Sequence, residues 1–128
     1  MPIASLDHLV LTVRDPDATR RFYVEGLGMR WTTFGEGRLA LSFGGQKINL
    51  HIAGREIEPK ATVALPGTGD LCFLLDDGEP LEEAAARLEG MGFPIVMGPA
   101  DQTGATGPIR SFYFRDPDGN LVEISRPR

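Results

Sequence analysis

Apolar and polar side chains alternate along several short segments of the chain, and this pattern predicts β-strands. Residues 7–14, DHLVLTVR, place both leucines and Val13 on one face and His8, Val10 and Thr12 on the other. Similar short segments rich in apolar residues follow at 30–34, 38–43, 47–52, 70–75, 93–98, 111–115 and 120–125. The chain is therefore expected to contain many short strands.

Two segments have the features of helices. Residues 15–28 begin with Asp15 as a cap and Pro16 in the first turn, and they end at Gly28. Residues 79–92, EPLEEAAARLEGMG, are rich in alanine and glutamate and end at Gly90 or Gly92. Each helix follows one strand and precedes three, so the predicted order is β-α-β-β-β, twice.

The two halves also resemble each other in sequence. GLGMRW and GMGFPI follow the two helices, and KINLHI and NLVEIS form the two closing strands. We therefore predict an α+β fold of two βαβββ modules, at about 5–55 and 68–126, that form a curved mixed sheet around a cleft. The modules are expected to make one domain over 1–128, since one module of about 60 residues would be marginally stable alone.

Charge and composition restrict the class of partner. Lys and Arg number 13 against 18 Asp and Glu, and the net charge of −5 opposes binding to nucleic acid or to an anionic membrane. No apolar run approaches the roughly 20 residues of a membrane span, and nothing resembles a signal peptide. The charge therefore favours a small-molecule substrate. The single cysteine, Cys72, cannot form an intramolecular disulfide, and a cytoplasmic protein is expected.

The strands that open and close the modules carry polar side chains opposite their apolar faces. Alternation places His8, Asn49 with His51, Asp70 with Cys72, and Glu123 with Ser125 on these faces. Imidazole and carboxylate groups together suit a borderline or hard divalent ion. His8, Asp70 and Glu123 are therefore the predicted metal ligands, for Zn, Ni, Mn or Fe(II).

The segments LDHLVLTVRD, FYVEGLGM, GDLCFLL and FRDPDGNLVEIS resemble the vicinal oxygen chelate superfamily, which contains glyoxalases, fosfomycin and bleomycin resistance proteins, and extradiol dioxygenases. FGGQKINLHIAG, EPKA and TGATGPIRSFYFRDPDGNLVEIS look closest to a group of glyoxalase-domain proteins that includes virulence-associated proteins. The resemblance covers essentially the whole chain. It implies metal ligands at His8, Asp70 and Glu123, with Asn49 at the remaining closing-strand position, and a homodimer whose sites draw ligands from both chains.

The resemblance implies a divalent-metal-dependent glyoxalase-like enzyme, a lyase or isomerase, acting on a small oxygen-rich substrate through a metal-stabilised enolate or oxyanion. Glyoxalase I generally carries glutamate or glutamine in place of Asn49, and histidine or glutamate in place of Asp70. Because an amide is no base, Glu123 or His51 is expected to take the proton.

Two alternatives stay open. One is an extradiol ring-cleavage dioxygenase, which needs two histidines, His8 and His51 being the only ones in the chain. The other is a metal-free binding protein that sequesters an antibiotic such as bleomycin in an aromatic groove. The candidates for that groove are Trp31, Phe34, Phe43, Phe112, Tyr113 and Phe114.

Residues outside the predicted metal site are candidates for holding the substrate. Arg38 and Arg110 begin corresponding strands and are expected to pair with a substrate anion, while Asn49 faces the cleft. The segment 98–110, rich in Gly, Pro and Thr, is either a mobile flap over the cleft or an ordinary connection.

Overall fold

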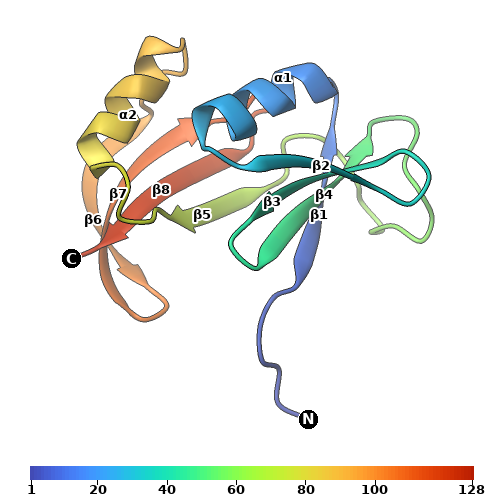
Figure 1. Ribbon diagram of the computed structural model, residues 1–128, viewed down its shortest axis with the longest axis horizontal. Helices are drawn as coiled ribbons and strands as arrows, with labels where there is room; N and C mark the ends of the chain where they lie inside the picture. Colours follow the sequence, from blue (N-terminus) through green and yellow to red (C-terminus); the bar gives the residue numbers. More distant parts are fainter. The chain divides into compact units, whose positions relative to one another are not determined.

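The computed structural model describes all residues from Met1 to Arg128 and divides the chain into two compact units, Met1–Gly67 and Thr68–Arg128 (Figure 1). Each unit contains one four-stranded mixed sheet and helical residues between its first two strands. The α+β class and the order β-α-β-β-β, repeated once, are confirmed. No helix is long and apolar enough to cross a membrane.

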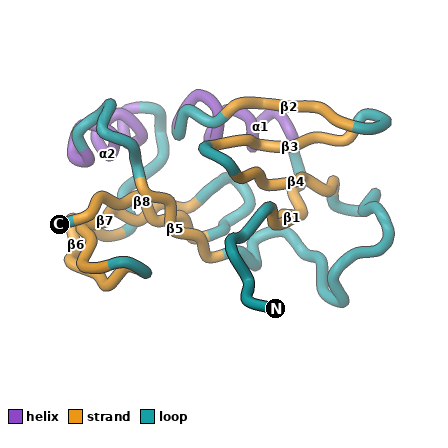
Figure 2. Tube along the Cα trace, turned by 60° about the horizontal axis from the view of Figure 1, so that its bottom comes forward, coloured by secondary structure: helices purple, strands orange, loops and turns teal.

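The first unit opens and closes on two parallel neighbours. Its elements are β1 (His8–Val13), α1 (Pro16–Arg20), η1 (Arg21–Gly26), β2 (Arg30–Phe34), β3 (Arg38–Phe43) and β4 (Gln46–Ile52). The strand order is β1-β4-β3-β2, as Figure 2 shows; β1 and β4 run parallel, and the other neighbours are antiparallel. This register pairs Val10 with Asn49 and Thr12 with His51, so these four side chains share one face.

The first helical segment begins as predicted but changes its geometry. The Asp15 side chain accepts a hydrogen bond from the Asp17 N–H at 3.0 Å, and Pro16 occupies the first turn. From Arg21 the helix widens to a π-helix, in which Leu27 N–H donates to the Phe22 carbonyl. Phe22 and Tyr23 are both buried in the core. Their rings contact each other edge to face, with the ring centroids 4.9 Å apart.

The second unit repeats this arrangement. Its elements are β5 (Asp70–Leu74), α2 (Leu81–Gly90), β6 (Met97–Gly104), β7 (Gly107–Arg115) and β8 (Leu121–Pro127). The strand order is β5-β8-β7-β6, with β5 and β8 parallel (Figure 2). Leu81, Ala84, Ala85 and Leu88 of α2 are buried, as are Phe112, Phe114, Val122 and Ile124 of the sheet. These apolar side chains form the core of the unit on one face of the sheet, which leaves the other face for function.

The prediction of a strand at 93–98 is wrong in its position. Only Met97 and Gly98 of that segment belong to a strand, and β6 continues to Gly104, through residues expected to form a flap or a connection. These residues pair with β7 as a hairpin whose turn lies at 105–106. Pairing through the backbone needs no apolar side chains, and a sheet edge is open to solvent, so a polar segment can form this strand.

Candidate functional site

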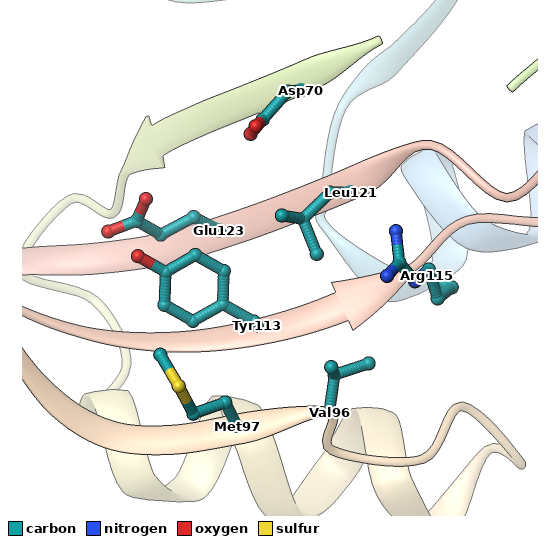
Figure 3. A pocket seen from close by; sticks show the side chains of 7 residues that line it. All are labelled: Asp70, Val96, Met97, Tyr113, Arg115, Leu121 and Glu123. Carbon is teal, nitrogen blue, oxygen red and sulfur yellow. The ribbon is translucent and has the colours of Figure 1, made fainter. Parts of the chain in front are cut away.

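An open pocket of about 400 Å³ lies on the sheet of the second unit, on the face opposite the buried core (Figure 3). Its lining residues come from β5, β8, β7, the first residue of β6 and the residue before it: Asp70, Leu121, Glu123, Tyr113, Arg115, Met97 and Val96. The pocket therefore combines two carboxylates, a phenol and a guanidinium with three apolar side chains. A concave site with a few convergent polar groups is the usual form of a small-molecule site.

The DPDG turn fixes the relative position of the two pocket carboxylates. Asp116 Oδ1 accepts hydrogen bonds from the N–H groups of Asp118 and Asn120, and Asp116 Oδ2 accepts one from Asn120 Nδ2 at 2.8 Å. Asn120 Oδ1 in turn accepts the N–H of Gly69 at 2.7 Å. The buried Asn120 side chain thus joins the residue before Asp70 to the start of the strand that carries Glu123.

The register of three strands gathers polar side chains around Glu123. Glu123 is paired with Cys72 across the parallel β5–β8 ladder and with Tyr113 across the antiparallel β7–β8 ladder. Paired strand residues point to the same face of a sheet, and so do residues two positions apart. Asp70 and Ser125 are therefore on the face of Glu123, and Figure 3 shows the Tyr113 hydroxyl next to the Glu123 carboxylate.

A chain of hydroxyl groups lies behind the carboxylate of Glu123. Ser111 Oγ donates to Glu123 Oε2 at 2.5 Å and contacts Ser125 Oγ at 2.7 Å. Ser125 Oγ lies 3.3 Å from Cys72 Sγ. Both serines are fully buried, so the network holds Oε2 of Glu123 from within the protein.

The two carboxylates of the pocket are not paired with a cation. Neither Asp70 nor Glu123 forms an ion pair with a side chain of the protein. Burial raises the pKa of the Cys72 thiol, and the charges of Glu123 and Asp70 raise it further. Burial also raises the pKa of Tyr113, and so does its hydrogen bond to Glu123. The pocket thus favours neutral or positively charged species beside the two carboxylates.

A bulge in β6 forms the far wall of the pocket. Met97 pairs with Tyr113 and Ala100 with Ser111, so Gly98 and Pro99 oppose a single residue of β7. Gly98 has φ +133°, and a Cβ there would lie 2.8 Å from the Ser111 carbonyl oxygen. Glycine allows β6 to approach β7 closely and keeps Met97 on the pocket face.

The predicted ligand from the first unit lies at the start of β1. His8 is partly exposed, and its Nδ1 contacts Asp7 Oδ2 at 2.8 Å. A carboxylate only accepts hydrogen bonds, so Nδ1 carries the hydrogen and Nε2 of the neutral ring keeps its lone pair. His8 is thus held in the tautomer that binds a metal through Nε2.

Asn49 and His51 are neighbours on one face of β4, and both are buried. The Asn49 Oδ1 atom has no hydrogen-bond partner, which leaves an acceptor for a further group. The backbone N–H of Gly54 holds the pKa of Glu56 below its usual range, and the charge of His51 adds to this effect. His51 therefore lies within electrostatic range of a carboxylate in its own unit.

The two arginines predicted to bind substrate have partners in their own units. The Arg38 guanidinium lies 4.7 Å from the centre of the Phe34 ring. Arg110 forms two 2.8 Å contacts with Glu82 of α2, through Nε and Nη2. Arg110 is thus directed to the helix face of the sheet, whereas the pocket lies on the other face.

The donor types fit a divalent metal, although the described chain contains no group of three His, Cys, Asp or Glu side chains placed to hold one. The second unit brings two carboxylates, Asp70 and Glu123, to one pocket. Neither carboxylate has a cation of its own, and His8 offers a free imidazole nitrogen from the first unit. One imidazole and two carboxylates form a donor set that Zn, Mn, Fe(II) or Ni accepts.

The prediction of the site from sequence missed five residues of the pocket and its support: Arg115, Leu121, Val96, Met97 and Ser111. Of the aromatic side chains considered for a groove, only Tyr113 lines the pocket. Ser111, Tyr113 and Arg115 alternate with Phe112 and Phe114, and this signal is visible in the sequence SFYFR. What the sequence lacked was the register that pairs this polar set with Glu123.

Comparison with known proteins agrees with this geometry. Residues 5–124 match the model of the glyoxalase/bleomycin resistance protein/dioxygenase superfamily. The chain is 52% identical over 125 residues to the glyoxalase domain-containing protein RDO1 of Mycosarcoma maydis, covering 98% of this chain and 69% of that protein. It is also 52% identical over 126 residues to virulence protein STM3117 of Salmonella typhimurium, covering 98% of this chain and 86% of that protein.

Solved structures give the same result. The crystal structure of virulence protein STM3117 superposes with a TM-score of 0.94 at 51% identity, covering all of both chains. Lactoylglutathione lyase from Agrobacterium tumefaciens superposes with a TM-score of 0.72 at 26% identity, covering 98% of this chain and 96% of that one. With its repeated βαβββ order, its polar sheet face and these matches, the chain belongs to the glyoxalase/bleomycin resistance protein/dioxygenase superfamily, the vicinal oxygen chelate proteins.

Proposed function

We propose that the protein is a divalent-metal-dependent enzyme with glyoxalase-like chemistry, in which His8, Asp70 and Glu123 hold the ion. The observation that carries the proposal is the pair of carboxylates, Asp70 and Glu123, in one pocket, neither of them in an ion pair with a side chain of the protein. Two adjacent carboxylates repel each other, and a bound cation removes that repulsion. Similarity to lactoylglutathione lyase supports an isomerase or lyase reaction.

We assign the third ligand to His8 of the first unit, since the pocket lining of the second unit offers carboxylates but no imidazole. His8 is suited to the task, since Asp7 fixes its ring and leaves Nε2 available. We propose a homodimer in which His8 of one protomer joins Asp70 and Glu123 of its partner. A stable assembly of this kind would complete two equivalent sites.

The protein's own groups then supply orientation and proton transfer. A bound divalent ion acts as a Lewis acid that stabilises negative charge on a substrate oxygen. Ser111 holds Oε2 of Glu123, which fixes the orientation of this carboxylate. Tyr113 offers a hydroxyl at the same place. A small oxygen-rich substrate would lie between these groups and the apolar side chains of Leu121 and Met97.

Two side chains are candidates for the base that removes a substrate proton. Glu123 lies in the pocket, and we assign it this task in addition to metal binding. His51 is the second candidate, since histidine is the side chain that most often serves as a general base. Replacing His51 with glutamine separates the two: unchanged turnover assigns the step to Glu123, and a loss of turnover with normal metal content assigns it to His51.

The experiment that tests the proposal is the metal content of untagged protein. We expect close to one divalent ion per chain in the wild type, and a large loss in a double variant with Asp70→Asn and Glu123→Gln. A variant with His8→Gln should show a similar loss. The matched control replaces two exposed carboxylates outside the pocket, Glu36→Gln and Glu89→Gln, and should keep its metal.

The outcome also separates the alternatives. Iron in the purified protein would direct the search to oxygen-dependent ring cleavage, whereas zinc, nickel or manganese would favour isomerase or transferase chemistry. No metal in any variant, even after divalent ions are added back, would contradict the proposal. The open pocket with apolar side chains would then be expected to sequester a small molecule without catalysis, as an antibiotic-binding protein does.

A further inference from the structure

We propose that Arg115 is an anion anchor that selects substrates with a carboxylate at the end opposite their metal-binding oxygens. This inference rests on the proposed function and adds the substrate class to it. No prediction from sequence or comparison assigns a role to Arg115.

Arg115 is placed in the pocket by the same strand that carries Tyr113. It pairs with Leu121 of β8, whereas Tyr113 pairs with Glu123, so Arg115 lies two residues further along β7. Two residues of a strand span about 7 Å. Figure 3 shows Glu123 and the Tyr113 hydroxyl together at one end of the pocket, Arg115 at the other, and Leu121 between them.

The charge of Arg115 is available to a ligand. Its side chain is exposed and pairs with no carboxylate of the protein. Other arginines of this unit are engaged: Arg87 pairs with Glu79, Arg110 with Glu82, and Arg126 with Asp77. Arg115 is the arginine of the pocket lining, and no ion pair with the protein has to break when a ligand binds to it.

The pocket therefore has opposite charges at its two ends and apolar side chains between them. Glu123 carries negative charge at one end and Arg115 carries positive charge at the other, while Leu121, Val96 and Met97 are apolar. Asp70 is paired with Leu121 and lies on the β5 side of the pocket, separated from Arg115 by β8. A planar guanidinium binds the two oxygens of a carboxylate through paired hydrogen bonds. The matching ligand has an oxygen-rich end for the metal, a short apolar middle of a few carbons, and a terminal carboxylate.

Monohydroxamates of dicarboxylic acids test this inference, because the hydroxamate chelates a metal and the free carboxylate at the other end can bind the Arg115 guanidinium. The zinc-loaded protein is titrated calorimetrically with the monohydroxamates of succinic, adipic and suberic acid. Each is compared with the alkyl hydroxamate of equal length, which ends in a methyl group. We expect about tenfold tighter binding of the acid for at least one length.

Replacing the arginine should abolish this preference. In Arg115→Gln we expect the acid and the alkyl hydroxamate of that length to bind about equally, while Arg115→Lys keeps part of the difference. The control Arg55→Gln removes an exposed arginine of the first unit and should leave the preference unchanged. Zinc uptake and the thermal midpoint should be the same in all four proteins.

Each outcome decides a separate point. If zinc binds but no acid is preferred, or if Arg115→Gln keeps the preference, the inference about Arg115 is wrong and the proposed metal site stands. If zinc does not bind to the wild type, the proposed function fails, and the anchor role fails with it.

Discussion

Ser111 donates its hydroxyl hydrogen to Oε2 of Glu123 at 2.5 Å from a fully buried position on the neighbouring strand. Ser125 supports this contact by lying 2.7 Å from Ser111 Oγ. A carboxylate held in this way has one oxygen fixed by the protein, so its orientation is set before any ligand arrives.

Replacing Ser111 with alanine should therefore weaken metal binding. Groups that orient a metal ligand typically contribute about 10- to 100-fold to affinity, and we expect a loss of about tenfold or more. Titration of the metal-free protein with Mn²⁺ or Zn²⁺ measures it. Ser42→Ala, which removes a strand hydroxyl of the first unit that contacts Thr32, is the matched control and should bind metal normally. Equal affinity in both variants would show that Ser111 does not orient Glu123.

Replacing Gly98 with alanine should destabilise the protein by more than the same change at Gly107. Both residues have a large positive φ, +133° and +143°, which alanine rarely adopts. Only at Gly98 would the new Cβ collide with neighbouring atoms, at 2.8 Å from the Ser111 carbonyl oxygen and 2.9 Å from Phe112 Cα. The collision should cost about 1–3 kcal/mol beyond the shared backbone strain. Urea denaturation of both variants measures the difference; equal losses would show that β6 can move away from β7 at no cost.

The pair formed by Arg110 and Glu82 should make stability depend on pH in the acid range. The hydrogen bond from Arg110 is the main reason why the pKa of Glu82 lies below its ordinary value of 4.5. A lowered pKa in the folded state gives stability above the ordinary pKa, which is lost as the pH falls through the folded value. The thermal midpoint of the wild type should therefore fall further between pH 7 and pH 3 than the thermal midpoint of Arg110→Gln.

This pH effect has an internal control. Glu82→Gln removes the other partner of the same pair and should show the same reduced dependence on pH. If Arg110→Gln and the wild type have parallel midpoints over the whole range, the pair contributes nothing to stability. The effect should be small at every pH, because both side chains are substantially exposed.

Replacing Leu88 with alanine should test the packing of α2 on its sheet. Leu88 is fully buried, and truncating a buried leucine typically costs about 2–5 kcal/mol, because a cavity remains. The free energy of unfolding in urea measures this loss. Leu74→Ala is the control, since Leu74 is 57% exposed and its truncation should cost little. A loss below about 1 kcal/mol for Leu88→Ala would contradict the core described for this unit.

The periodicity of the sequence determined most of the strands but failed at one segment. The apolar residues of FPIVMG, 93–98, predict a strand. In the structure the Phe93 N–H instead donates to the Leu88 carbonyl at the end of α2. The polar segment that follows forms β6. Apolar content reports burial, whereas strand formation depends on a pairing partner, and here the partner is the distant strand β7.

The alternation of the strands also placed Asp70, Cys72 and Glu123 on one face, and the register agrees with that face. This much follows from local rules, because side chains two positions apart always point the same way in a strand. The same rule separates Arg110 from Arg115, which are five positions apart on β7 and so point to opposite faces. The sequence could not decide which of the two faces the pocket.

The amino-acid sequence by itself determined the repeated order of elements, the apolar and polar faces of most strands and the superfamily, because these depend on periodicity and local motifs. Tertiary structure decided which residues meet. Ser111, Tyr113 and Arg115 reach Glu123 and its pocket through the antiparallel register of β7 and β8, and Arg110 reaches Glu82 through the packing of α2. Register and packing are set by the whole sheet and its core, so no short segment of the chain encodes them.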